Sequence, residues 1–364
     1  MERSLIFLVG LVAAALITPA VSLVARRSGT VDRPRGARKL HRRPTPLLGG
    51  VAVFLSLIVA VAVARGLGWL PGDYIRDKYL IGMSLAALLL VFGGALDDRY
   101  DLRPSRQIVW PILATLVIIG SGIGVTYITN PLGGQIFLDR HVVTVLWWDG
   151  LPYKLTLLAD IFTAAWLLGM TYTTKFLDGL DGLVSGLAVI GCLIIAAVSL
   201  MQEVSQPDTA VLALAVAGAF AGFLVFNFHP ARIFLGEGGS TLAGFIIGTL
   251  AIIAGGKIAT ALLVLGVPLL DAGAVILRRL IVERRSPVSG DRSHLHFRLI
   301  DLGLTHRQAV LVFYLLALMF GTSTLFLRGW QKLAALGFLV GAAIILLAFV
   351  GRTRRSDDRA AGTG

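Results

Sequence analysis

Eleven long apolar segments dominate this sequence and constrain its fold more than any other feature. They lie at roughly 4–25, 47–64, 79–96, 108–128, 155–174, 183–200, 210–228, 240–256, 259–277, 309–327 and 331–350. An α-helix needs about 20 mostly apolar residues to cross the hydrocarbon core of a bilayer. Hydrophobic residues make up 56% of the chain and charged residues 15%, which excludes a soluble domain of this length. We therefore predict an all-α polytopic membrane protein, with about eleven transmembrane helices in one domain over residues 1–350.

The distribution of lysine and arginine predicts how these helices are oriented. If the 26–46 loop is cytoplasmic, the cytoplasmic side carries 24 of the 33 lysine and arginine residues. Because basic residues concentrate on the cytoplasmic side of membrane proteins, we expect the N-terminus outside and the C-terminus inside. Residues 351–364 read as a disordered charged tail. In the long outside loop, the glycines at 133–134 predict a short hairpin over 135–146.

The segment Lys175–Leu183 places charged residues between two apolar segments. An ionised side chain at the centre of a membrane helix costs at least ~2.5–3.5 kcal/mol, so it is seldom there without a function. Asp178 and Asp181 would share one face if the helix continued, while the two glycines of this segment favour a bent backbone. Carboxylates beside bare backbone predict a site for a metal or a polar ligand.

Two further acidic sites lie at the ends of apolar segments. Asp97 and Asp98 end the third segment, and the C-terminal end of a helix is a poor place for adjacent negative charges unless something positive offsets them. Glu237 lies among glycines ahead of Ser240, in a turn suited to hold an anion. The alternatives are a solvated helix end and an ordinary capped loop. The predicted topology puts these acids on the cytoplasmic face with Asp178 and Asp181.

Two basic loops lie on the same predicted face. Residues 291–298 contain Arg292, His294, His296 and Arg298, whose donors suit phosphate oxygens; a metal site there would lack a third ligand. A basic surface near anionic headgroups is the alternative. The loop 32–50, with Lys39 and His41, is most simply a positive-inside anchor. Carboxylates beside basic loops at a lipid–water boundary suit Mg²⁺-assisted chemistry on phosphates.

These motifs together resemble those of the polyprenyl-phosphate N-acetylhexosamine-1-phosphate transferase family. The likeness runs from about Asp32 to Gln308 and is closer to the N-acetylglucosamine branch than to the muramoyl-pentapeptide branch. The motifs are Arg38-Lys39-x-His41 with Pro46 and Gly49-Gly50, Asp97-Asp98, Asp178-Gly-x-Asp181-Gly-Leu183, Phe226-Asn227-x-x-Pro230-Ala231, Pro268-x-x-Asp271, Ser286-Pro287 and Asp291-Arg292-x-His294-x-His296.

The resemblance implies attack by a polyprenyl phosphate on a UDP-N-acetylhexosamine, most simply UDP-N-acetylglucosamine. The products are a polyprenyl diphosphate-sugar and UMP. Asp97 and Asp98 are implied at the reacting phosphates, and Glu237 with Asp181 at Mg²⁺ or Mn²⁺. Residues implied in substrate binding are Lys39, His41, Lys175, Asp178, Asp181, Asn227, Arg292, His294, His296 and Arg298. The resemblance also implies a bacterial plasma-membrane enzyme with a cytoplasmic catalytic face, a homodimer, and no nucleic-acid partner.

The sequence departs from the family pattern at several site positions. The family usually has asparagine at Tyr172 and Lys175, aspartate at Glu237, lysine near Gln107 and histidine at Phe297. A charged lysine cannot ligate Mg²⁺. Our hypothesis is that Lys175 supplies the phosphate-facing charge missing at Gln107, and that the longer Glu237 reaches a displaced metal.

Two other functions are compatible with the sequence alone. Membrane carboxylates often mark ion paths, so a transporter of an anionic solute is the main alternative, although transporter sites lie near the midplane between repeats. A catalytically inactive relative that binds lipid or nucleotide is the other alternative. The sequence does not specify the sugar epimer, the lipid length or the downstream glycan.

Overall fold

The computed structural model describes residues 2–34, 43–72, 75–129, 134–139, 142–148, 151–255, 258–284, 294–327 and 329–342. Its α-helices are α1 (Ile6–Arg27), α2 (Gly49–Gly66), α3 (Asp77–Tyr100), α4 (Pro104–Gln107), α5 (Val109–Ser121), α6 (Leu157–Leu177), α7 (Leu183–Ser199), α8 (Pro207–Asn227), α9 (Gly236–Ile253), α10 (Ile258–Val264), α11 (Gly266–Leu277), α12 (Leu295–Asp301) and α13 (His306–Ser323). A 3₁₀-helix (Glu2–Leu5) precedes α1, a π-helix (Arg278–Glu283) continues α11, and residues 330–342 are also helical.

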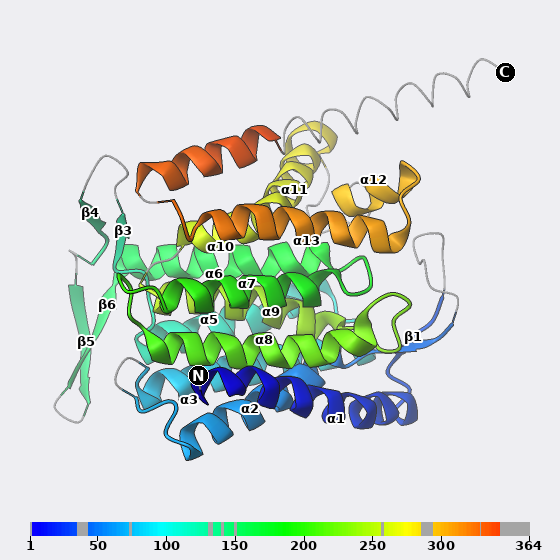
Figure 1. The fold of residues 1–364 in the computed structure, drawn as a ribbon, viewed down its shortest axis with the longest axis horizontal. Coiled ribbons are helices and arrows are strands. Elements are labelled where there is room, and N and C mark those ends of the chain that lie inside the picture. Colours follow the sequence, from blue (N-terminus) through cyan, green and yellow to red (C-terminus); the bar gives the residue numbers. More distant parts are fainter. Residues whose placement is uncertain are drawn as a thin grey trace.

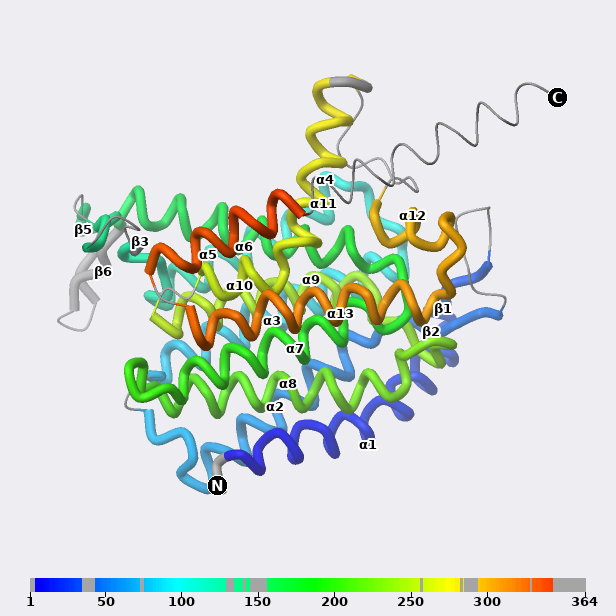
Figure 2. The backbone as a smooth tube through the Cα atoms, turned by 45° about the horizontal axis from the view of Figure 1, so that its top comes forward, coloured from blue at the N-terminus to red at the C-terminus, as the bar shows by residue number. Residues whose placement is uncertain are grey.

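The long helices lie side by side in one bundle, with β3 to β6 at one end and β1, β2 and α12 at the other (Figures 1 and 2). Helix α9 forms its core, since 89% of its most apolar stretch is buried, against 33% for α1. Helix α9 packs against α3 and α6, while α1 packs against α2 and α8. The central position of α9 brings its first turn, with Glu237, among the ends of other helices.

Glycines let α2, α3 and α9 approach at backbone distance beside the acidic residues. A Cβ atom on Gly94 of α3 would overlap the backbone of Gly238 in α9, and one on Gly50 of α2 would meet the Gly238 carbonyl carbon at 2.7 Å. Small residues permit such close packing of membrane helices. Because Gly94 lies one turn before residues 97–98 and Gly238 directly follows Glu237, this contact places the carboxylates of two helices together.

The prediction of a helical membrane protein is confirmed in outline. Five described helices, α1, α2, α3, α8 and α9, are long and apolar enough to cross a membrane. Helices α10 and α11 meet the same test as a pair bent by 78°, which gives six if the pair is one span. Each of the eleven predicted segments contains described helix, but several are short; α5, for example, ends at Ser121, where residues up to 128 were expected to be apolar helix. The count of eleven spans is therefore not confirmed, and the predicted tail lies outside the described residues.

Strands add a small correction to the all-α class. The structure contains β1 (Val31–Asp32), β2 (Thr45–Pro46), β3 (Tyr127–Thr129), β4 (Gln135–Phe137), β5 (Val142–Trp148) and β6 (Leu151–Thr156). They pair antiparallel as β1–β2, β3–β4 and β5–β6. The single hairpin predicted over 135–146 is therefore wrong, because β4 pairs with the strand that precedes it in the sequence and β5 with the strand that follows.

Candidate active site

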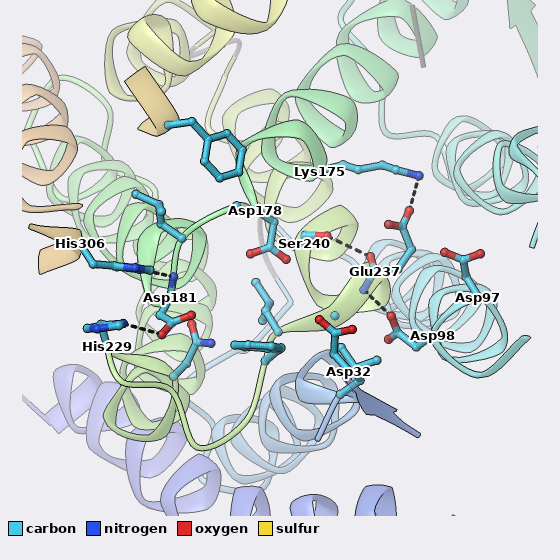
Figure 3. A pocket seen from close by; sticks show the side chains of 18 residues that line it. Asp32, Asp97, Asp98, Lys175, Asp178, Asp181, His229, Glu237, Ser240 and His306 are labelled. Carbon is cyan, nitrogen blue, oxygen red and sulfur yellow. Dashed lines mark hydrogen bonds and ion pairs between the residues drawn. The ribbon is translucent and has the colours of Figure 1, made fainter. Parts of the chain in front are cut away.

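A pocket of about 320 Å³ opens where the ends of α3, α6 and α8 meet the starts of α7, α9 and α13 (Figure 3). Six carboxylates, one lysine and two histidines line it: Asp32, Asp97, Asp98, Asp178, Asp181, Glu237, Lys175, His229 and His306. The pocket thus brings together the acidic residues that the predicted topology placed on one face. So many like charges in one pocket require cations for all of them to stay ionised.

Asp97 and Asp98 lie in the last turn of α3 and have different partners. Asp97 Oδ1 accepts hydrogen bonds from the Leu102 N–H at 2.8 Å and from Gln107 Nε2 at 2.9 Å. Asp98 Oδ1 accepts the Glu237 N–H at 3.1 Å. Since Glu237 belongs to the first turn of α9, Asp98 lies against the partial positive charge of a helix N-terminus. Part of the positive charge expected beside this acidic pair therefore comes from α9.

Lys175 connects Glu237 with the Asp97 side of the pocket. It forms an ion pair with Glu237, donates to Gln107 Oε1 at 2.9 Å, and lies 5.5 Å from the centre of the Tyr172 ring. Its side chain is only 14% exposed. Because Gln107 also donates to Asp97, a continuous chain of polar contacts runs from Asp97 through Gln107 and Lys175 to Glu237. Lys175 is the sole lysine or arginine among the described residues that line the pocket.

The contacts of Lys175 bear on the charge-exchange hypothesis. Lys175 contacts both Gln107 and Glu237, so three of the departures from the family pattern lie in one chain of contacts. A positive charge carried at 175 instead of 107 therefore stays within the same chain of contacts, beside Glu237 rather than beside Asp97. The role of Glu237 in reaching a displaced metal stays a prediction.

Asp178 points into the pocket between Asp181 and Glu237 (Figure 3). Its side chain is open to the pocket, yet it lies deep among protein atoms. This withdrawal from bulk water, followed by the charges of Glu237, Asp98 and Asp181, raises the pKa of Asp178 well above its usual value. A cation in the pocket would favour its ionised form.

Asp181 forms a cluster with two histidines at the other side of the pocket. Its Oδ2 lies 2.8 Å from His229 Nδ1 and accepts the Ala231 N–H at 3.1 Å. Its own N–H donates to His306 Nε2 at 2.8 Å, and the two imidazole rings stack with centroids 4.0 Å apart. The potential ligand atoms lie within 4.8 Å of one another. However, His306 Nε2 is occupied by the Asp181 N–H, and the lone pairs of nearly parallel rings lie in separate planes. The cluster therefore fits a hydrogen-bonded unit better than a metal site.

Three ionisable residues of the pocket fall outside the predicted site residues: Asp32, His229 and His306. Each lies in a connection that the lysine and arginine distribution assigns to the cytoplasmic side. Topology therefore carried a signal for them, but no motif spacing separated them from other polar loop residues.

Asn227 lines the pocket but is engaged with the loops around it. Its Oδ1 accepts hydrogen bonds from the Gly182 N–H at 3.2 Å and from Ser185 Oγ at 2.7 Å. Its Nδ2 donates to the Ile233 carbonyl at 3.0 Å. These contacts tie the α6–α7 connection to the α8–α9 connection, so the observed contacts of Asn227 position both loops. Substrate contact by Asn227 stays a prediction.

The predicted histidines His294 and His296 lie behind the pocket wall rather than in it. His294 Nδ1 is 3.0 Å from Asp271 Oδ2, which fixes the start of α12 on α11. His296 is fully buried against Gly179, and neither ring nitrogen has a hydrogen-bond partner among the described residues. Burial, and then the neighbouring His294 and His306, lowers the pKa of His296 to about 3. His296 is therefore neutral at physiological pH.

Arg298 lies in α12 and is partly buried. It is not among the residues that line the pocket. The remaining predicted substrate-binding residues, Lys39, His41 and Arg292, lie outside the described residues.

The low pKa of His296 predicts a specific pH dependence of stability. Below pH 6.5 the unfolded chain binds a proton at this residue that the folded chain does not bind. Stability is therefore fully present above pH 6.5, and each pH unit from there toward 3 costs up to ~1.4 kcal/mol. His296→Gln should flatten this loss, so that wild type loses more thermal stability than the variant between pH 7.5 and 5. Melting curves in detergent test this; parallel loss in both proteins would contradict it.

The donor set of the pocket fits a hard divalent cation. Mg²⁺ binds oxygen ligands, typically one or two carboxylates completed by water and phosphate oxygens. Asp181 and Glu237, the predicted metal ligands, lie on different sides of the pocket, Asp181 beside His229 and Glu237 beside residues 97–98 (Figure 3). The acids around Glu237 therefore offer the denser group of oxygen donors.

The chain resembles known proteins over most of its length. A sequence profile for glycosyl transferase family 4 matches residues 80–255. A probable undecaprenyl-phosphate N-acetylglucosaminyl 1-phosphate transferase of Bacillus subtilis (strain 168) is 32% identical over 344 residues, covering 92% of this chain and 88% of that protein. A decaprenyl-phosphate N-acetylglucosaminephosphotransferase of Mycolicibacterium smegmatis is 33% identical, covering 97% and 90%. An undecaprenyl-phosphate alpha-N-acetylglucosaminyl 1-phosphate transferase of Escherichia coli (strain K12) is 32% identical, covering 81% and 75%.

Proposed function

Because this chain belongs to glycosyl transferase family 4, we propose that it transfers N-acetylglucosamine 1-phosphate from UDP-N-acetylglucosamine to a polyprenyl phosphate. An oxygen of the lipid phosphate attacks the phosphorus next to the sugar and forms a new P–O–P link. The bond from that phosphorus to the bridging oxygen of the UDP diphosphate breaks, and UMP leaves with this oxygen. The observation that carries the proposal is the pocket that gathers six carboxylates and one lysine at the helix ends.

The pocket suits phosphoryl transfer because such reactions depend mainly on positioning and charge stabilisation. Bound Mg²⁺, held at Glu237 and the 97–98 pair, would neutralise the diphosphate. At neutral pH the lipid phosphate is already largely ionised, so Asp97 and Asp98 contribute more by placing the reactants than by removing a proton. Lys175 supplies a positive charge beside the same acids for the leaving diphosphate oxygen. His296 is fully buried behind Gly179 and does not line the described pocket, so its contact with a phosphate oxygen or the sugar stays a prediction.

We place the pocket on the cytoplasmic face of a bacterial plasma membrane, with the N-terminus outside. The excess of lysine and arginine in the 26–46 loop and in residues 278–308 supports this orientation. On that face the pocket has access to a water-soluble nucleotide sugar and to the phosphate of a membrane-embedded acceptor.

One assay separates the enzyme from the two alternatives. Purified protein is incubated with polyprenyl phosphate, UDP-N-acetylglucosamine and Mg²⁺, and UMP and the lipid-linked sugar are measured. We expect them in equal amounts, and neither when the lipid phosphate is omitted. Binding of UDP-N-acetylglucosamine without UMP would indicate an inactive relative, and uptake of the nucleotide into vesicles without UMP a transporter. Absence of UMP with every UDP-N-acetylhexosamine tested, from folded protein, would refute the proposal.

A further inference from the structure

A second cavity of about 490 Å³ lies beside the active-site pocket and has the opposite charge. We name it the arginine groove; its lining residues are Thr18, Pro19, Ser22, Arg26, Arg43, Pro44, Thr45, Phe226, Ala231, Arg232 and Ile233. It lies between the C-terminal half of α1, the chain entering β2 and the α8–α9 connection. Three segments distant in sequence thus contribute one arginine each to a single hollow.

The described residues that line the arginine groove do not compensate its charge. No aspartate or glutamate is among its described lining residues. Among the described residues, ion pairs join Arg65 with Asp77, Lys175 with Glu237, His229 with Asp181 and His294 with Asp271, and none of these four pairs involves Arg26, Arg43 or Arg232. Arg26, Arg43 and Arg232 therefore present three guanidinium groups to whatever occupies the groove. Guanidinium groups bind phosphate oxygens in a bidentate manner and are the preferred phosphate ligands of proteins.

The surroundings of the groove favour a phosphate carried by a lipid. Pro19, Phe226 and Ile233 provide apolar contacts inside it. Large apolar side chains next to it on α1 and α8 are exposed, including Leu23 at 49% and Val225 at 68%. Both helices are long and apolar enough to span a membrane, so this exposed surface faces acyl chains. An occupant with a phosphate at one end and acyl chains at the other satisfies both parts of the surface.

We propose that the arginine groove binds an anionic phospholipid, with its phosphate among Arg26, Arg43 and Arg232 and its acyl chains along α1 and α8. The groove shares the α8–α9 connection with the active site. The Ala231 N–H binds Asp181, while the next residue, Arg232, faces the groove. A bound phospholipid therefore holds the connection that also carries one wall of the active-site pocket.

The test measures lipid affinity of the intact protein in neutral detergent. Dioleoyl phosphatidylglycerol is titrated against the protein and retention is followed by native mass spectrometry, with phosphatidylcholine as the uncharged comparison. Each basic residue near a membrane surface contributes about fivefold to the affinity for anionic lipid. Arg26→Gln, Arg43→Gln and Arg232→Gln should each weaken phosphatidylglycerol binding by about that factor. Arg27→Gln is the matched control, because Arg27 is the exposed neighbour of Arg26 on α1 but does not line the groove.

Several outcomes would overturn the proposal. Equal loss in Arg27→Gln would show unspecific attraction to surface charge. Equal retention of phosphatidylglycerol and phosphatidylcholine would remove the phosphate from the recognition. Displacement of the lipid by inorganic phosphate at similar concentration would identify an ion site. Displacement by trace polyprenyl phosphate, with a raised KM for that acceptor in Arg43→Gln, would assign the groove to the substrate. Unchanged melting temperatures of the variants would show that the differences in lipid affinity come from the groove and not from unfolding.

Discussion

Asp98→Asn should lower kcat by about 10²–10³-fold, the usual cost of removing one preorganised charged or polar group from a reacting centre. Asparagine keeps the size of the side chain, and its Oδ1 can still accept the Glu237 N–H that Asp98 accepts at 3.1 Å. The contact between α3 and α9 therefore survives and only the charge is lost. Asp97→Asn should behave alike, since its hydrogen bonds from Leu102 and Gln107 are also made to one oxygen. UMP release at saturating substrates measures both effects.

Asp101→Asn is the matched control for these variants. Asp101 follows α3 at the same end of the bundle, is exposed, and does not line the pocket. Its left-handed backbone, with φ of 50°, is a conformation that asparagine adopts readily. Activity within twofold of wild type is expected. If Asp98→Asn retained a tenth or more of wild-type kcat, the acid would have no catalytic role and the assignment of the pocket would fail.

The convergence of the acidic residues was predictable because of a simple property of membrane helices. Once spans are placed on the chain, every second connection must return to the same side, so Asp97, Asp178 and Glu237 are expected on one face. The structure brings these residues into one pocket. The orientation of that face is a prediction from the lysine and arginine count.

Contacts between side chains were less predictable than their common face. The ion pair of Lys175 with Glu237 depends on how closely α3, α6 and α9 approach, and this approach is set by glycines whose role is seen only in three dimensions. The stacking of His229 on His306 joins residues from two connections that no local pattern links. The hydropathy of the sequence also did not predict the helix lengths, because an apolar stretch continues beyond a helix end such as Ser121 without a change in composition.

Lys175→Met should have two opposite effects, lowering turnover and tightening metal binding. Lys175 is the one lysine or arginine among the described residues that line the pocket. Its loss should therefore reduce kcat/KM by about 10²-fold, as for one lost electrostatic contact. It also competes with a metal for Glu237. Two unit charges 4 Å apart interact with ~1 kcal/mol in water and ~4 kcal/mol near a protein surface. Removing the repulsion between the lysine and Mn²⁺ should therefore tighten Mn²⁺ binding by about tenfold. Electron paramagnetic resonance of free Mn²⁺ measures this without turnover.

Moving the lysine from position 175 to the contacting position 107 tests whether its location matters. Lys175→Asn alone should lose activity, and Gln107→Lys added to it should restore most of it, because the side chains at 107 and 175 are hydrogen-bonded at 2.9 Å and contact acids of the same pocket, Asp97 and Glu237. Lys78→Met is the control: Lys78 also lies over a tyrosine ring, at 5.1 Å, but in the first turn of α3, a helix length away from Asp97. It should change neither turnover nor Mn²⁺ affinity. Retained or higher activity in Lys175→Asn would contradict the exchange, since the charge at 175 would then be dispensable and Glu237 would need no partner for catalysis.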